Sequence, residues 1–105
     1  MVTELTFVPI GCGEENKELI AQATRIIAES DRPYLLTATG ILIDAEWDEV
    51  MQLAKKCHDA LLRECPRLII DIHIDDRSDP GNSLKQQTIE VEYALGRSLE
   101  TGGLT

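Results

Sequence analysis

Hydrophobic and polar residues alternate between positions 67 and 75, and this period of two predicts a β-strand with two different faces. One face of the strand is aliphatic and carries Leu68, Ile70, Ile72 and Ile74. The other face carries Arg67, Asp71, His73 and Asp75. A chain of 105 residues can cover one side of a sheet with its own helices. We therefore expect the polar face to meet solvent, a ligand or another subunit.

The first half of the chain contains three further strands and one helix by the same kind of pattern. Alternation predicts a strand over residues 2–10, and apolar residues at helical spacing over 19–27 predict a helix. That helix should end near Asp31, because Pro33 disfavours helical geometry in the residue before it. Residues 34–39 and 41–43 indicate two strands joined near Gly40, although one long bent strand fits the pattern equally.

Two helices flank the strand at 67–75. Asp44 occupies the position of an N-cap, and an apolar stripe that includes Trp47 continues to Pro66, which ends the helix. Ser83 and Gln86 have the spacing of a capping box for a last helix near the C-terminus.

The order of elements is strand, helix, strand, strand, helix, strand, followed by an additional helix. Two βαβ units with their helices on one side form an α+β, ferredoxin-like βαββαβ sandwich, here with an additional C-terminal helix. We expect residues 1–105 to form a single domain, because no linker or repeat divides the chain. The sandwich leaves one face of the sheet bare, which favours dimerisation, and the last helix is a natural clasp between subunits.

Composition and charge exclude several classes of protein. The formal net charge of −9 disfavours nucleic acid and anionic lipid and favours a cationic small molecule. No segment has the length of a membrane span or the pattern of a signal peptide, so we expect a cytoplasmic protein without a membrane partner. The three cysteines lack a CxxC spacing, which is typical of reduced thiols.

The polar face of the predicted sheet is the strongest candidate for a site. The first and last strands of this fold are neighbours, so Glu4 and Thr6 should lie beside Asp71 and His73, with Thr37 and Thr39 on the middle strands. Such a floor of hydroxyls and carboxylates suits a small polar ligand. A hydrated subunit interface has the same composition and remains the alternative.

Other reactive residues support neither a metal site nor a catalytic centre. His58, His73 and Cys57 lie on different elements without ligand spacing, so no metal is expected. Cys12 follows a strand between two glycines, but nearby Glu14 opposes a lowered thiol pKa. An enzyme that uses Cys12, or His73 with Asp71, is therefore the weakest hypothesis.

Two residues beside the candidate face have structural interpretations. Arg77 is expected to form an ion pair with Asp75 or Asp76. Trp47 could stack on a planar cation, but its place on the helical stripe favours packing in the core.

Several segments, taken in order, resemble the thiamine-binding protein family. They are Pro9-Ile10-Gly11, the strand at 34–40, Trp47 to Met51 with His58 further along the helix, and Ile74 to Arg77. The chain departs from the family pattern at Cys12, Ile41 and Asp44. The resemblance implies a ferredoxin-like domain that forms dimers through the sheet face, often assembled into tetramers.

The resemblance also implies a function. It implies binding of thiamine or its hydroxymethylpyrimidine part near subunit contacts, and it does not imply catalysis. We therefore expect neither an enzyme nor a cofactor. Matching positions that could contact the ligand are Thr37, Thr39, Asp44 and Asp75, and the argument from the polar face adds Thr6 and Asp71. A structural or regulatory oligomer, whose polar face is a protein interface, is the alternative.

Overall fold

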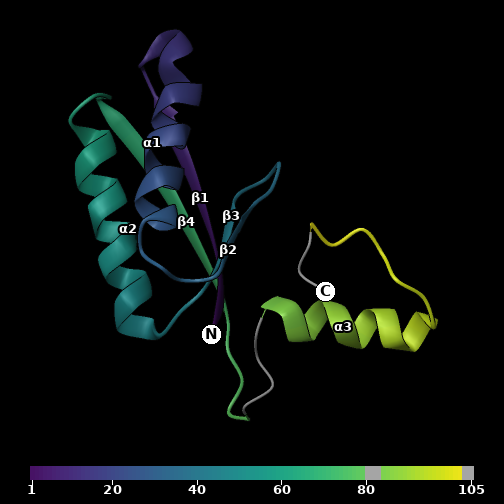
Figure 1. Ribbon diagram of the computed structural model, residues 1–105. Coiled ribbons are helices and arrows are strands. Elements are labelled where there is room, and N and C mark those ends of the chain that lie inside the picture. The colour runs from purple at the N-terminus through teal and green to yellow at the C-terminus, as the bar shows by residue number, and fades with distance from the viewer. Residues whose placement is uncertain (80–83, 103–105) are drawn as a thin grey trace.

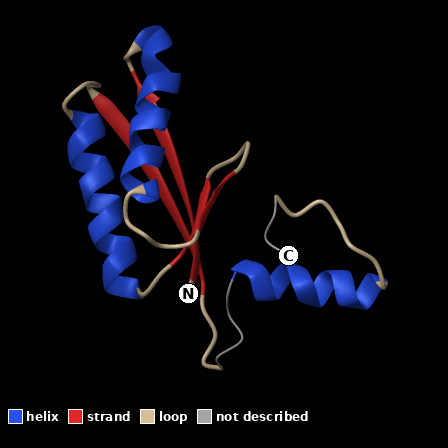
Figure 2. Ribbon diagram, in the orientation of Figure 1, coloured by secondary structure: helices blue, strands red, loops and turns tan. Residues whose placement is uncertain are grey.

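The computed structural model describes residues 1–79 and 84–102 and has two layers, a sheet and a pair of helices. Strands β1 (Val2–Ile10), β2 (Tyr34–Leu36), β3 (Ile41–Asp44) and β4 (Arg67–Asp75) form one sheet in the order β2-β3-β1-β4, and every neighbouring pair is antiparallel. Helices α1 (Asn16–Ala28) and α2 (Trp47–Leu62) cover one face of this sheet, as Figures 1 and 2 show. A short 3-10 turn (Gly13–Glu15) precedes α1. The predicted ferredoxin-like fold is confirmed.

The core lies between the sheet and the two helices, and its residues come from alternate strand positions. Leu5 and Phe7 of β1 and Ile41 and Ile43 of β3 are buried there. They meet buried residues of the helices, namely Leu19, Ala23 and Ile27 of α1 and Val50, Leu53, Ala54, Cys57 and Leu61 of α2. Because strand side chains alternate between faces, the intervening residues of β1 are left on the opposite, open face of the sheet.

The middle strands form a hairpin, which settles the alternative of one bent strand. β2 ends at Leu36, three residues earlier than predicted, and residues 37–40 form the turn. The backbone N–H of Thr37 donates to the carbonyl of Gly40 at 2.9 Å, which closes the turn. Thr37 and Thr39 therefore belong to a turn and not to the floor of the sheet.

The N-terminus of α2 differs from the prediction. Asp44 is still paired with Val2 in the sheet, so it is the last residue of β3 and not the N-cap. Glu46 is the N-cap instead, and its backbone N–H donates to Oε1 of Glu49 at 3.3 Å. The N-cap thus lies two residues later than predicted, and Ala45, which precedes it, is buried in the core.

The expectation that Trp47 packs in the core was wrong. Trp47 is 56% exposed and is the first residue of α2. Arg77 forms an ion pair with Asp79, at 2.7 Å between Nη2 and Oδ2, and its backbone N–H donates to Oδ1 of Asp76 at 3.0 Å.

The last helix, α3 (Leu84–Leu95), stands apart from the sandwich on the side opposite α1 and α2 (Figure 1). Leu84 is its buried residue, whereas Val91, Tyr93 and Leu95 are exposed. The predicted capping residue, Ser83, lies outside the described residues.

The molecule is less compact than a sphere-like domain of its length. The radius of gyration is 15.0 Å, against about 13 Å for a compact chain of ~100 residues. The projecting helix explains the difference.

Candidate functional site

The open face of the sheet brings the predicted polar residues of β1 and β4 together. In the register of these strands Glu4 lies opposite His73, and Thr6 lies opposite Asp71. Directly opposed side chains on one face of an antiparallel pair are close enough to interact. The expectation that these four residues are neighbours is confirmed.

Thr6, Thr37 and Thr39 surround a cavity at the fork where the β2–β3 hairpin diverges from β1. β3 pairs with β1 only as far as Leu5, and beyond this point the hairpin turns away, as Figure 1 shows. The space that opens has a volume of about 200 Å³. Its lining is Leu5, Thr6, Phe7, Ile20, Leu36, Thr37, Ala38, Thr39, Gly40 and Ile41. We refer to this space as the threonine cavity.

Hydrogen bonds hold the three threonines in place. The hydroxyl of Thr6 donates to the carbonyl of Thr39 at 3.1 Å. The hydroxyl of Thr37 donates to the carbonyl of Gly40 at 2.9 Å and accepts from the backbone N–H groups of Gly40 and Thr39 at 3.1 and 3.3 Å. Thr37 therefore stabilises the turn itself. Within residues 1–79 and 84–102, the hydroxyl of Thr39 contacts that of Thr37, at 3.4 Å, and keeps capacity for a ligand.

Gly40 permits the close approach of the hairpin to β1. A Cβ at this position would lie 2.9 Å from both the carbonyl oxygen of Leu5 and the hydroxyl of Thr6. Because the first of these atoms belongs to the backbone, it cannot rotate away. Any side chain at position 40 would therefore push the hairpin and β1 apart and change the mouth of the threonine cavity.

The remaining two predicted ligand residues lie at the other end of the sheet. Asp44 and Asp75 are the register partners of Val2 from the two sides. Asp75 lines a shallow depression of about 290 Å³ on the open face, together with Val2, Glu4, Leu42 and His73. Of the six predicted residues, Thr6, Thr37 and Thr39 thus line the threonine cavity, and Asp71 is opposite Thr6 in the register of β1 and β4. Asp44 and Asp75 lie at the other end of the sheet.

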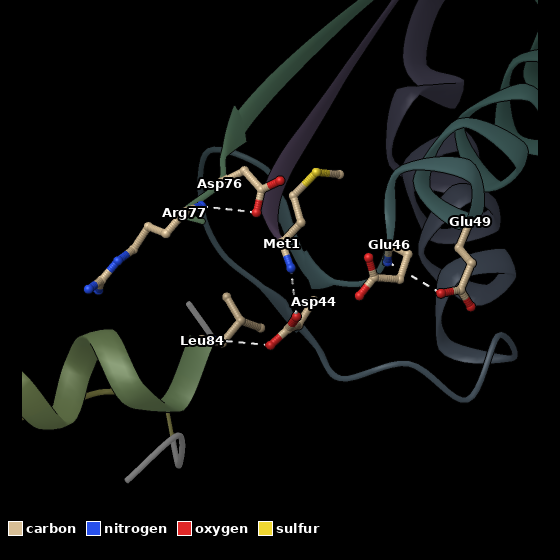
Figure 3. Close-up of polar contacts among 7 residues, drawn as sticks. All are labelled: Met1, Asp44, Glu46, Glu49, Asp76, Arg77 and Leu84. Carbon is tan, nitrogen blue, oxygen red and sulfur yellow. Dashed lines mark hydrogen bonds and ion pairs between the residues drawn. The ribbon is translucent and has the colours of Figure 1, made fainter. Parts of the chain in front are cut away.

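The carboxylate of Asp44 joins three parts of the chain (Figure 3). Its Oδ1 lies 3.4 Å from the amino group of Met1, and its Oδ2 accepts from the backbone N–H of Leu84 at 3.3 Å. Asp44 therefore neutralises the amino terminus and caps the first turn of α3, a role that stabilises a helix. Because Leu84 is forty residues away in sequence, no local pattern indicated this contact.

Cys57, Cys12 and His58 each contact a group of the chain itself. Burial raises the pKa of the Cys57 thiol to about 11, and this thiol donates to the carbonyl of Ala23. Cys12 is hydrogen bonded to Oδ1 of Asn16 at 2.8 Å. Nδ1 of His58 lies 3.0 Å from Oδ1 of Asp59, whose pKa is lowered by hydrogen bonds from Lys55 and then His58.

Neither a metal cluster nor a membrane helix occurs in the part of the chain that the structure describes. Within residues 1–79 and 84–102 no three acidic, histidine or cysteine side chains are grouped as metal ligands would be. The helices in those ranges are too short or too polar to cross a bilayer.

The apolar walls of the threonine cavity were not predicted as part of a site. Phe7 and Ile20 were assigned to a strand and a helix only because of their hydrophobicity, Ile41 was noted as a departure from the family pattern, and Ala38 carries no chemical signal. The glycine at position 40, directly after Thr39, is the local signal that indicated a turn at this place.

The chain is similar to known proteins over most of its length. It is 27% identical over 99 residues to a UPF0045 protein of Synechocystis, which covers 93% of this chain and 82% of the relative. A crystal structure of a hypothetical protein from Methanocaldococcus jannaschii superposes with a TM-score of 0.79 at 23% identity, covering 92% of this chain and 96% of that one.

A second solved structure carries a functional description. It is that of a candidate thiamine biosynthesis/salvage protein from Thermotoga maritima, with a TM-score of 0.77 at 18% identity, covering 86% of this chain and 96% of that one. At these identities the two structures show the shared fold. The sequence model of the thiamine-binding protein family matches residues 3–92 of this chain. The match confirms the predicted resemblance, and this chain belongs to the thiamine-binding protein family.

Proposed function

We propose that this protein is a non-catalytic binding protein for thiamine, its hydroxymethylpyrimidine part or a related cationic heterocycle, and that the ligand enters the threonine cavity. Family membership supports a small-molecule role. The observation that carries the proposal is a cavity with both apolar walls and hydroxyl groups at one fork of the sheet. Pockets for small molecules combine these two features.

The walls and hydroxyls of the cavity complement an aminopyrimidine. Phe7, Ile20 and Leu36 offer apolar surface to a flat ring, and the hydroxyl of Thr39 can donate to or accept from ring nitrogens and the amino group. Asp71 lies opposite Thr6 on the neighbouring strand, where a carboxylate attracts a positive thiazolium. Within this proposal Asp44 has a structural role, because its two oxygens already serve Met1 and Leu84.

The proposal places the binding sites near subunit interfaces. The assembly is a homo-oligomer, either a dimer or a tetramer, and it acts in the cytoplasm. Two apolar residues of the open face support an assembly through this face. Val8 and Ile69 are opposed in the register of β1 and β4, and they are 41% and 37% exposed. Exposed apolar side chains amid polar ones are typical of an interface that is covered in an assembly.

The same two residues favour the alternative, a structural or regulatory oligomer without a small ligand. Under that alternative neither thiamine nor hydroxymethylpyrimidine changes the melting temperature. Thermal unfolding of the wild type with each compound distinguishes the two functions. Ile69→Lys should dissociate the assembly under both functions, and light scattering of this variant tests the open-face contact.

Titration calorimetry and thermal unfolding with thiamine and with hydroxymethylpyrimidine test the proposal directly. A ligand at about 100 times its Kd stabilises a protein by ~2.7 kcal/mol, which raises the Tm by several degrees. Thr39→Val should weaken binding roughly tenfold, the equivalent of one hydrogen bond of about 1.4 kcal/mol. Thr88→Val is the matched control, because the hydroxyl of Thr88 donates to the carbonyl of Lys85 within helix α3, at 2.9 Å. No response to millimolar amounts of either compound would refute the proposal.

A further inference from the structure

Two of the three cysteines lie at the same end of the sheet, where β1 ends and β4 begins (Figure 1). Cys12 is in the connection between β1 and the 3-10 turn, and Cys65 is in the connection between α2 and β4. The third, Cys57, lies within α2 and is completely buried. The fold therefore brings two cysteines that are distant in sequence to neighbouring connections.

The two connections continue the register of the strands that they adjoin. The last pair of β1 and β4 is Ile10 with Arg67. The following pair is still in contact, because a Cβ on Gly11 would lie 2.6 Å from Cγ of Pro66. The two chains therefore remain side by side one residue beyond the sheet.

Cys12 and Cys65 are the next residues of the two chains, and both contribute to the same core. Gly11 has a φ of 86°, a left-handed conformation that ends the alternation of β1. Cys65 is 5% exposed and belongs to the core, and Cys12 packs against that core. Antiparallel chains in register hold opposed Cα atoms about 4.5–5.5 Å apart, within the range that a disulfide bridges.

The two thiols differ in exposure. Cys12 is partly exposed, and its Sγ lies 2.8 Å from Oδ1 of Asn16. The buried thiol of Cys65 donates to the carbonyl of Leu61 at 3.3 Å. A thiol is a weak hydrogen-bond donor, so either side chain can leave its partner at little cost. Cys12 is therefore the thiol that a reagent meets first, and Cys65 is the thiol that reacts with it afterwards.

We propose that Cys12 and Cys65 form a reversible disulfide when the protein meets a small-molecule disulfide such as oxidised glutathione. The thiolate of Cys12 attacks one sulfur of that molecule, whose S–S bond breaks, and the first small thiol leaves with the proton that Cys12 lost. Cys65 then attacks Sγ of Cys12, and the second small thiol leaves with the proton of Cys65. Two protein thiols are oxidised, and one small disulfide is reduced to two thiols.

Cys57 takes no part in this exchange. Burial raises the pKa of its thiol to about 11, and its Sγ donates to the carbonyl of Ala23 on α1. The attacking species in thiol–disulfide exchange is the thiolate. A completely buried thiol that stays protonated at neutral pH reacts with neither the reagent nor Cys12.

The disulfide joins the connection before α1 to the connection after α2, and so links the two halves of the sandwich at one end. A cross-link between residues far apart in sequence restricts the unfolded chain, which stabilises the folded one. In a reducing compartment such a disulfide is transient and acts as a redox sensor. The oxidised form is thus the more stable of two states that the redox conditions interconvert.

Intact-mass spectrometry after incubation with oxidised glutathione tests the disulfide. The wild type should lose two hydrogen atoms and give, after digestion, one peptide pair that joins Cys12 to Cys65. Dithiothreitol should reverse both changes. Cys65→Ser should retain glutathione on Cys12, because the second thiol is absent. Cys12→Ser should give neither product, because Cys65 is buried.

Cys57→Ala is the matched control, because it removes a thiol and should still form the same cross-link. Thermal unfolding measures the effect of the disulfide. The Tm of the oxidised wild type should be several degrees above that of the reduced wild type, whereas glutathione treatment should leave the Tm of Cys12→Ser unchanged. Circular dichroism of all variants verifies the fold. Three free thiols in the treated wild type, or a link between two chains or to Cys57 in place of the expected pair, would overturn the inference.

Discussion

Thr3 and Thr6 are two threonines on the same strand that differ in the partner of their hydroxyl groups. The hydroxyl of Thr6 donates to the carbonyl of Thr39 on the hairpin. Thr3 points to the helical side, is completely buried, and its hydroxyl has no hydrogen-bond partner among the described residues. A buried polar group without a partner costs about 1–3 kcal/mol of folding free energy.

Thr3→Val should therefore stabilise the protein by about 1 kcal/mol, because valine has the same shape and no group to satisfy. Thr6→Val is the matched comparison and should destabilise by about 0.5–1.5 kcal/mol through the lost hydrogen bond. Urea denaturation of both variants measures the two changes. A loss of stability in Thr3→Val would indicate that its hydroxyl has a partner in solution.

Helix α3 is attached to the sandwich by few contacts. Leu84 is buried against the domain, and the backbone N–H of Leu84 donates to the carboxylate of Asp44. The first turn of α3 contains no acidic residue that could favour the positive end of the helix dipole. The carboxylate of Asp44, which comes from β3, supplies that charge from outside the helix.

Asp44→Ala should accordingly release the first turn of α3 and cost about 1 kcal/mol, the usual effect of losing an N-cap. Amide hydrogen exchange in residues 84–88 should become faster, whereas exchange in α2 should stay the same. Asp44→Asn retains an acceptor for Leu84 and should show the smaller effect. Equal exchange rates in Asp44→Ala and the wild type would mean that Leu84 alone holds the helix.

The charge of the whole molecule affects every ligand that approaches it. The formal net charge is −9, and at 0.1 M salt the field of exposed charges extends about 10 Å. The threonine cavity has Asp71 on the strand beside Thr6, so the general field and a local carboxylate act in the same direction. Both attract a cation and leave a neutral ring unaffected.

On the proposed function, the affinity for cationic thiamine should fall several-fold between 20 mM and 500 mM salt, because exposed charges are screened. The affinity for neutral hydroxymethylpyrimidine should change much less. Calorimetry of both ligands in the two buffers makes the comparison within one protein. An equal response of the two ligands would contradict an electrostatic contribution to thiamine binding.

The sequence by itself determined the order of most elements, the faces that they bury and the fold, and it left open whether residues 34–43 form one strand or two. Period two placed Leu5 and Phe7 on the helical side and Thr6 on the open side, and helical spacing placed Val50 and Leu61 in the core. These features depend on neighbours a few residues away, so a local pattern is sufficient to predict them. The neighbourhood of Glu4 and Thr6 with His73 and Asp71 followed from the fold, because its first and last strands are adjacent in the sheet.

Only the tertiary structure decided which predicted residues share a site. Thr6 meets Thr39 across 33 positions of sequence, and Asp44 meets Leu84 across 40. Trp47 satisfies the helical pattern, yet it is 56% exposed at the start of α2. Such contacts depend on how segments that are distant in sequence pack in the folded chain. The spacing of residues along the sequence does not specify that packing.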